Sequence, residues 1–374
     1  MQQNKNLHIA MIGQKRVPSR FGGIDVVVER LSKELMESGN SILLFNRRRK
    51  EEKPLKEYDG ATVKECFTIN TKAFDALIYS FFATIKAKKL AKKGELDVIH
   101  FHSEGVCGFL DFFPKREKRN YKIIVTVHGI DSQRAKFKGL GSKVLRSCEH
   151  KIAKYADEII VLNERDAKYF KDNFNRETIL IPNAIDLEEV VGADLIEKNW
   201  QLQKDKYILT VARLVAEKGI HYLIDAWQNF SKDIKGDKKL VIAGSFAHDK
   251  KYFSLIKEKS KGDNSIIFTD FANGKALKEL YSNAKLFVLP SELEGMSMAL
   301  LEALSFGKDC LVSDIIENKS VLNGKGLTFK SKDAKDLQSK LEDYLSGKIS
   351  ASVKGVKLYT WKEIAQKTLE LYKK

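Results

Sequence analysis

Residues 290–304 read PSELEGMSMALLEAL, and this stretch indicates how the whole chain is organised. An apolar run at 285–289 comes directly before it, and residues 297–306 carry apolar side chains at helical spacing. The resulting strand–loop–helix unit holds two carboxylates, Glu294 and Glu302, eight residues apart. We expect such units to repeat along the chain, because doubly wound sheets are built from them.

Strand-like and helix-like segments do alternate along the chain. The apolar runs lie at 7–12, 41–45, 97–101, 122–127, 158–162, 178–181, 207–212, 239–243, 265–269, 285–289 and 309–313. Amphipathic segments between them include 25–38, 141–155, 219–230, 275–283 and 297–306. This alternation is typical of doubly wound α/β sheets, and a break at 186–205 separates the runs into two sets. We therefore expect two Rossmann-like domains.

The composition supports a globular protein of two domains. The chain has 374 residues, 43% hydrophobic and 31% charged. Its four cysteines are scattered without a CxxC pair, so neither a disulfide framework nor a zinc site is indicated, and a cytoplasmic location is expected. The N-terminus lacks the apolar core of a signal peptide. The apolar run at 76–85 is shorter than the roughly 20 residues of a membrane-spanning helix.

The net charge of +16 is concentrated in the first half of the chain. Residues 1–187 have 35 Lys and Arg against 24 Asp and Glu, whereas the remainder has 31 against 26. The first half is therefore expected to face an anionic partner: nucleic acid, an anionic membrane surface or a phosphorylated substrate. General solubility is the alternative explanation of this charge.

Polar residues of catalytic type follow several of the predicted strands. His102, His128, Arg213 and Glu294 each come at or soon after the end of an apolar run. Ligands of open α/β sheets bind beyond the carboxyl ends of the strands. If the strand ends of both domains face each other, an interdomain cleft is the expected site.

Glycines and cations mark two possible phosphate sites. Gly22 and Gly23 lie between the first strand and a helix, where backbone N–H groups can approach a phosphate, although a plain turn explains them equally well. Arg213 and Lys218, in VARLVAEKG, lie at the entry to another helix. They suit a diphosphate or else belong to a solvated loop. No GxGxxG or GxxxxGK[ST] motif is present, which disfavours dinucleotide and P-loop sites.

The two carboxylates allow a structural and a functional interpretation. Glu302 has apolar Met298 and Phe306 one helical turn away on either side, so its charge needs a partner. Eight residues of helix span about 12 Å, which is comparable to the distance from a sugar hydroxyl across a diphosphate to a ribose, with one acid on the sugar and the other on the ribose. The partner is then the ligand. Alternatively, Ser291 and Glu294 form a helix capping box and Glu302 is an ordinary helix-face carboxylate.

These residues together resemble family 4 of the retaining glycosyltransferases, which have the GT-B fold. The resemblance covers almost the whole chain. It rests on the E-x7-E motif of Glu294 and Glu302 and on the segments GGIDVVVERL, YADEIIVLNERDAKYF, IPNAID, ARLVAEKG and YTWKEIAQKTLELY, in the family's order. The segments MIGQKRVPSRFGGIDVVVERL and VTVHGIDSQRAKF look like a bacterial subgroup that builds capsule or other surface polysaccharides.

The resemblance implies domains and residue roles. It implies an acceptor-binding domain at 1–187, a donor-binding domain at 188–355 and a final helix within 356–374 that packs back on the first domain. The implied catalytic residues are Arg213, Lys218, Glu294 and His128. The implied donor-binding residues are Gly22, Gly23, Gly295, Met296, Ser297 and Glu302, and the acceptor side is expected to include His102, Glu104 and Asp131. Subgroup members commonly have Glu at the position of Asp25 and an acidic residue at that of Phe21, so this chain departs from the subgroup's pattern in that loop.

The implied reaction moves a hexose from a nucleotide-diphosphate sugar, of UDP, GDP or dTDP type, to a saccharide acceptor such as one linked to polyprenyl diphosphate. Many glycosyltransferases hold a metal ion with a DxD pair, but no two Asp residues here are separated by one residue. We therefore expect no cofactor and no metal, with protein cations stabilising the leaving group. His100 and His102 share one strand face, but no third ligand at metal-binding spacing accompanies them.

The segment at 80–94, SFFATIKAKKLAKKG, mixes aromatic residues with five lysines. It suits a helix on an anionic bilayer, at the inner face of the cell membrane, or a helix packed on the core by the same apolar residues. Two other functions are alternatives. A nucleotide-sugar epimerase shares the fold, and a nucleic-acid-binding protein would explain the charge, although no RNP motif, zinc pair or helix-turn-helix supports nucleic acid as a partner.

Overall fold

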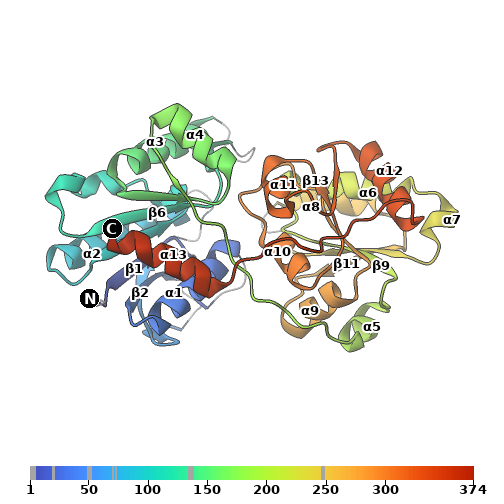
Figure 1. Cartoon of the computed structure of the whole chain (residues 1–374), viewed down its shortest axis with the longest axis horizontal. Coiled ribbons are helices and arrows are strands. Elements are labelled where there is room, and N and C mark those ends of the chain that lie inside the picture. Colours follow the sequence, from blue (N-terminus) through green and yellow to red (C-terminus); the bar gives the residue numbers. More distant parts are fainter. Residues whose placement is uncertain are drawn as a thin grey trace. The chain divides into compact units, whose positions relative to one another are not determined.

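The computed structural model describes residues 6–18, 22–48, 53–69, 71, 74–133, 139–245 and 249–374. The chain forms two compact units (Figure 1). Unit 1 comprises Met1–Ala184 together with Tyr359–Lys374, and unit 2 comprises Ile185–Leu358. Each unit is a sheet covered by helices, so the two predicted doubly wound α/β sheets are confirmed.

Unit 1 contains an eight-stranded sheet in the order β3-β4-β2-β1-β5-β6-β7-β8. Its strands are β1 (His8–Ile12), β2 (Ser41–Arg48), β3 (Glu57–Tyr58), β4 (Ala61–Phe67), β5 (Val98–His102), β6 (Lys122–Val127), β7 (Glu158–Val161) and β8 (Ile179–Leu180). Its helices are α1 (Gly23–Glu37), α2 (Asp75–Lys92), α3 (Leu140–Tyr155), α4 (Glu164–Phe174) and α13 (Trp361–Lys373), with short turns η1 (Glu104–Val106), η2 (Leu110–Phe112), η3 (Arg116–Lys118) and η4 (Asp131–Gln133).

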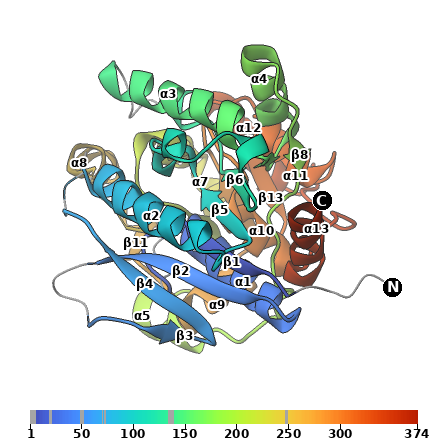
Figure 2. The ribbon, with the colours of Figure 1, turned by 90° about the vertical axis from the view of Figure 1, so that its left-hand side faces the viewer.

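The pairing is parallel throughout this sheet except between β3 and β4. Strands buried on both faces need apolar residues at successive positions, and β5 is buried along its whole length. Its Ile99 and Phe101 join the core cluster that includes residues of α2 and α3. Because side chains alternate along a strand, His100 and His102 occupy the opposite face. Figure 2 shows α2 lying along the sheet beside β4.

Unit 2 contains a six-stranded parallel sheet in the order β11-β10-β9-β12-β13-β14. Its strands are β9 (Tyr207–Val211), β10 (Lys239–Ala243), β11 (Ile266–Asp270), β12 (Leu286–Leu289), β13 (Cys310–Ser313) and β14 (Leu327–Phe329). Its helices are α5 (Asp194–Trp200), α6 (Ile220–Gln228), α7 (Lys232–Lys235), α8 (Lys250–Lys259), α9 (Gly274–Asn283), α10 (Met298–Ser305), α11 (Ile316–Leu322) and α12 (Ala334–Leu345), with the turn η5 (Ala216–Lys218). Alternate residues of β9 enter two separate cores, one on each face of the sheet.

Each sheet reverses its direction of winding at one place. In unit 1 the chain leaves β1 for β2 on one side and returns to β5 on the other. In unit 2 the corresponding neighbours are β9 and β12. The carboxyl ends of strands at such a switch point leave a crevice that ligands of this fold class use. A ligand site is therefore expected at the carboxyl ends of β1 and β5 in unit 1 and of β9 and β12 in unit 2.

Two general features complete the fold. All four cysteines are buried and none is bonded to another. Among the described residues, no helix combines the length and the apolar character needed to cross a bilayer.

Candidate active site

An ion pair stands at the switch point of unit 2. Lys218 ends the turn η5 that follows β9, and Glu294 lies in the loop that follows β12. The Lys218 Nζ is 2.5 Å from the Glu294 Oε1, and the two side chains are only 12% and 7% exposed. The Ser291 hydroxyl donates a second hydrogen bond to the same carboxylate oxygen, at 2.6 Å. Both residues were predicted as site residues, and the fold brings them together.

The two loops that carry this pair are held together by their backbones. The Glu292 N–H donates to the Glu217 carbonyl at 2.9 Å. Gly219, with φ +65°, begins α6 so close to the other loop that a Cβ there would lie 2.0 Å from the Pro290 carbonyl oxygen. Only glycine fits both the left-handed backbone and this approach. The Lys218–Glu294 geometry therefore depends on Gly219.

Further charged groups lie on the same two loops. Arg213, 45% exposed, lies 3.7 Å from the nearly buried Glu217 carboxylate. Glu292, on the loop after β12, accepts a hydrogen bond of 3.0 Å from the Tyr222 hydroxyl of α6. Lys332 forms an ion pair with the same carboxylate. Burial and this hydrogen bond raise the pKa of Tyr222 to about 12. Both predicted cations thus lie at the carboxyl end of β9, Arg213 toward solvent and Lys218 inside.

Glu302 has a partner within the protein. It lies on α10, where its Oε2 accepts a hydrogen bond of 2.8 Å from the buried Tyr281 hydroxyl. The Tyr281 ring stacks on Phe306, with ring centroids 5.6 Å apart. Burial, reinforced by the Glu302 charge, raises the pKa of Tyr281 well above its usual value. The apolar surroundings predicted for Glu302 are therefore present, and the Tyr281 hydroxyl is a hydrogen-bond partner that the sequence did not indicate.

The helical geometry predicted for the two carboxylates is wrong. The helix α10 begins only at Met298, so Glu294 lies in the preceding loop and the two acids do not share eight residues of helix. The capping box is also wrong, because Ser297 caps α10 by accepting from the Leu300 N–H at 3.3 Å. The loop that precedes the cap carries Gly295 and Met296. This turn-rich loop lets Glu294 reach back to Lys218.

Three histidines gather at the switch point of unit 1. The His100 and His102 rings lie 4.1 Å apart, as their shared strand face predicts. The His102 Nδ1 is 3.3 Å from the Nε2 of His128, which follows β6. His100 contacts the Tyr372 hydroxyl of α13 at 2.6 Å and Thr126 at 2.7 Å, so its neutral ring donates at one nitrogen and accepts at the other. The final helix therefore reaches the base of this cluster.

Burial keeps two of these rings neutral. It lowers the pKa of His100 to about 3, with a further contribution from His128. Burial also lowers the pKa of His102 well below its usual value, helped by His100 and His128. The Nε2 of His102 is buried and makes no hydrogen bond within the described ranges. At neutral pH the rings of His100 and His102 are therefore uncharged.

The predicted acceptor-side acids also meet here. Glu104 is fully buried on η1, and its Oε2 accepts a hydrogen bond of 2.7 Å from the Asp131 N–H. The Ser103 hydroxyl lies 3.5 Å from the Asp131 carboxylate. Burial, followed by the charges of Asp131 and Glu149, raises the pKa of Glu104 well above its usual value. Glu104 is therefore protonated under conditions in which an ordinary glutamate is ionised.

Replacing Glu104 with glutamine is expected to change how stability depends on pH. A carboxyl whose folded pKa is raised adds most stability below its unfolded pKa, near 4.3, and loses it as pH rises toward the folded value. Glu104→Gln has no such pH-dependent loss. Its melting temperature should therefore rise relative to that of the wild type as pH increases from about 5 to about 8. Calorimetry across this range measures it, with the exposed Glu164→Gln as control. Parallel curves for Glu104→Gln and the wild type would contradict the raised pKa.

The glycine pair lies at the start of α1. Gly22 is the N-cap of that helix, in an extended conformation, and a Cβ there would meet only Asp25 among the described residues, at 3.5 Å. Asp25 is buried and accepts the Lys15 N–H at 2.7 Å. Packing within the described part of unit 1 therefore does not require glycine at this position. Phe21 lies outside the described residues.

Comparison with known proteins covers both units. A family model described as Glycosyltransferase Family 4 matches residues 21–189, and a model described as Glycosyl transferases group 1 matches residues 193–356. Together they account for most of unit 1 and nearly all of unit 2. The chain belongs to glycosyltransferase family 4. Its lysine–glutamate pair and its histidine cluster are thus features of a GT-B glycosyltransferase.

Several named proteins resemble this glycosyltransferase. An Escherichia coli UDP-Gal:alpha-D-GlcNAc-diphosphoundecaprenol alpha-1,3-galactosyltransferase is 28% identical over 74% of this chain and 73% of its own. A Campylobacter jejuni N,N'-diacetylbacillosaminyl-diphospho-undecaprenol alpha-1,3-N-acetylgalactosaminyltransferase is 26% identical over 50% of this chain and 51% of its own.

Solved structures share the fold of this glycosyltransferase. Sucrose-phosphate synthase from Thermosynechococcus elongatus gives a TM-score of 0.81 at 20% identity, covering 98% of each chain. Anabaena HepE in complex with UDP and glucose gives 0.77 at 15% identity, covering 98% of this chain and 100% of its own. At these identities the likeness concerns the fold alone.

The sequence analysis missed several residues of both sites. Ser291 and Tyr281 each hold a predicted site residue by a hydrogen bond, and Tyr372 holds His100, whose ring neighbours that of the predicted His102. Tyr281 is 21 residues from Glu302, and Tyr372 is 272 residues from His100. Ser291 alone had a local signal, the same Ser-x-x-Glu spacing that was assigned to a helix cap.

Proposed function

We propose that this glycosyltransferase moves a hexose, with retention of configuration and without a metal ion, from a nucleotide-diphosphate sugar to a saccharide on a polyprenyl-diphosphate carrier. The reaction would serve synthesis of a cell-surface polysaccharide and would take place in the cytoplasm, at the inner face of the membrane. The relatives that act on diphosphoundecaprenol-linked sugars support this class of acceptor. The donor is of UDP, GDP or dTDP type.

One observation carries the proposal: Lys218 and Glu294 meet at the switch point of unit 2, nearly buried. In our proposal Glu294 accepts hydrogen bonds from the sugar hydroxyls, while Lys218 and Arg213 bind the diphosphate. As the bond from sugar to phosphate breaks, the departing phosphate gains negative charge. Cations already fixed in position stabilise that charge without reorganisation. The Lys218–Glu294 contact explains why each is held in place before the donor arrives.

The remaining predicted residues take supporting roles in this proposal. Glu302, oriented by Tyr281, would bind the ribose, and the loop of Gly295, Met296 and Ser297 would supply backbone groups to sugar and phosphate. In unit 1, His128 would stand near the reacting sugar. The neighbours His102, Glu104 and Asp131 would orient it or the acceptor, and Gly22 and Gly23 would contact the phosphates.

Retention without an evident nucleophile favours a route through an ion pair. The bond from the sugar carbon to the phosphate oxygen breaks first, and the acceptor oxygen then bonds to the same face of that carbon. The acceptor hydroxyl gives its proton to the departing phosphate. Nothing in this route requires a covalent intermediate on the protein.

A nucleotide screen tests the proposal and also identifies the donor base. Melting temperature is measured with UDP, GDP, dTDP and ADP, because a ligand bound to the folded state stabilises it by mass action. We expect one nucleotide to raise the melting temperature by several degrees at about 100 times its Kd, and Lys218→Ala to lose most of that rise. EDTA should leave both the shift and the transfer rate unchanged.

Three outcomes would overturn parts of this proposal. No shift with any of the four nucleotides would remove the donor site. A large loss of rate in EDTA would remove the metal independence. A sugar altered while still attached to its nucleotide, in the absence of acceptor, would indicate an epimerase in place of a transferase.

A further inference from the structure

Apart from Tyr79, the helix α2 places mainly small residues against the core, and several of its large apolar residues lie toward solvent. Its buried positions are Tyr79, Ser80, Ala83, Thr84, Ala87 and Ala91. By contrast, Leu77, Phe82 and Ile85 are 40%, 36% and 41% exposed. A helix that serves only to cover a sheet shows the reverse pattern, with the larger apolar side chains inside. Packing on the core therefore accounts for Leu90 but not for Leu77, Phe82 and Ile85.

The exposed residues of α2 share one face. At 3.6 residues per turn, Leu77, Phe82, Ile85 and the lysines between 88 and 92 fall within an arc of roughly 140°. The alanine-rich stripe lies on the opposite side. The helix thus has an outer face that is apolar in its first half and basic in its second.

Aromatic rings from neighbouring segments extend this outer face. Phe82 meets Phe67, which ends β4, with ring centroids 5.9 Å apart, and meets Phe81 at 5.4 Å. Phe81 in turn contacts Phe109 at 5.3 Å and Phe112 at 6.0 Å. Phe67 is 52% exposed and Phe112 is 37% exposed. The rings therefore form one partly exposed cluster, which we call the aromatic patch: Phe67, Phe81, Phe82, Phe109 and Phe112.

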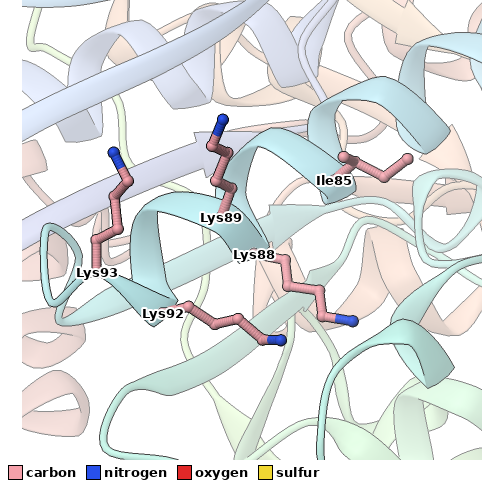
Figure 3. Close-up of a pocket in the computed structure, with 5 residues that line it drawn as sticks. All are labelled: Ile85, Lys88, Lys89, Lys92 and Lys93. Atoms are coloured by element: carbon pink, nitrogen blue, oxygen red, sulfur yellow. The ribbon is translucent and has the colours of Figure 1, made fainter.

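Lysines border the apolar face at its C-terminal end. Figure 3 shows a hollow lined by Ile85, Lys88, Lys89, Lys92 and Lys93, with Lys88 and Lys92 extending to one side of the helix and Lys89 and Lys93 to the other. In the described part of the chain, no ion pair joins Lys88, Lys89 or Lys92 to an acidic residue. Their charge is therefore available to an anionic partner.

We propose that this face of unit 1, the aromatic patch with Leu77, Ile85 and the four lysines, docks on an anionic lipid bilayer. Aromatic and aliphatic side chains would enter the boundary between headgroups and acyl chains, and lysines beside them would reach lipid phosphates. Lys93 pairs with Glu95 at 3.5 Å, but Lys88, Lys89 and Lys92 have no ion pair within the described residues. Apolar rings next to these three cations fit that boundary, whereas a protein partner would need matching acids. The proposal is independent of the transfer chemistry; only its consequence, proximity to a lipid-linked acceptor, rests on the proposed function.

Co-sedimentation with vesicles tests the docking. The full chain is mixed with vesicles of phosphatidylethanolamine containing phosphatidylglycerol, or with vesicles of phosphatidylcholine alone. We expect binding to the anionic vesicles that falls as salt is raised, and little binding to the neutral ones. Replacing Lys88, Lys89, Lys92 and Lys93 with glutamine should weaken binding about tenfold or more. The apolar variant Leu77→Gln/Phe82→Gln/Ile85→Gln should weaken it similarly.

A matched control separates this face from the overall charge. Replacing four exposed lysines of unit 2 with glutamine removes the same charge and should leave vesicle binding within about twofold; these are Lys261, Lys319, Lys325 and Lys335. Equal losses in the two lysine variants would overturn the proposal, as would no binding to anionic vesicles at low salt. A concentration-dependent dimer that the apolar variant abolishes would assign the face to a second copy of this chain.

The nucleotide screen, repeated on the same variants, separates the two proposals. A chain that binds a nucleotide but no vesicles refutes the docking alone. A chain that binds vesicles but no nucleotide refutes the proposed function alone.

Discussion

Replacing Lys218 with methionine is expected to abolish transfer and to destabilise unit 2. The change removes the cation proposed to bind the diphosphate, a loss of roughly a hundredfold to a thousandfold in rate. It also leaves Glu294, only 7% exposed, without its ion-pair partner. Removing one member of such a pair costs about 3 kcal/mol of unfolding free energy. Urea unfolding and a transfer assay with the nucleotide sugar identified by the screen measure the two effects.

The double variant Lys218→Met/Glu294→Gln separates stability from activity. It removes both charges, and glutamine still accepts the Ser291 hydroxyl hydrogen bond, so we expect its stability to return to within about 1 kcal/mol of the wild type. Its transfer rate should stay as low as that of Lys218→Met. A double variant that regains activity along with stability would show that the pair is structural and that the chemistry lies elsewhere.

Gly219→Ala is expected to disturb both loops of the same site. Its Cβ would lie 2.0 Å from the Pro290 carbonyl oxygen, so the backbones that carry Lys218 and Glu294 must move apart. We expect a loss of about 3 kcal/mol or more, because overlap adds to the strain of a left-handed alanine. A displacement of about 1 Å costs roughly a hundredfold in rate. Tryptophan fluorescence can follow the unfolding, since Trp200 and Trp227 belong to this unit.

Gly307 provides the matched control for this substitution. It also has φ +65° and lies in unit 2, but nothing stands within 4 Å of the position its Cβ would take. Gly307→Ala should therefore show only the backbone strain, about 1 kcal/mol, and keep its transfer rate. Equal effects at both positions would mean that the approach of the two loops is unimportant.

Much of the fold was predictable because its signals are local. The apolar runs at 122–127 and 239–243 match β6 and β10 at both ends. The strand β4 was missed, although its first four residues, ATVK, alternate between buried and exposed positions. Lys64 and Glu65 interrupt this segment, so it does not form a continuous apolar run like those of the predicted strands.

The candidate site was predicted residue by residue but not in its contacts. Lys218 and Glu294 were each assigned to a substrate, one to the diphosphate and one to the sugar, and their pairing across 76 residues had no signal in either segment. The histidines of β5 were placed on one face correctly, because alternation along a strand is a local rule. The contact of His100 with Tyr372 depends on how α13 returns to unit 1, which spacing along the chain does not encode.

The return of α13 has a consequence for the order in which the protein is completed on the ribosome. Unit 2 is one continuous segment, whereas unit 1 needs residues 359–374, which are translated after all of unit 2. Until then His100 lacks Tyr372, and α1 lacks the helix that packs on it. The unit that begins first is therefore finished last, so a nascent chain can contain a folded unit 2 while the histidine cluster of unit 1 still lacks Tyr372.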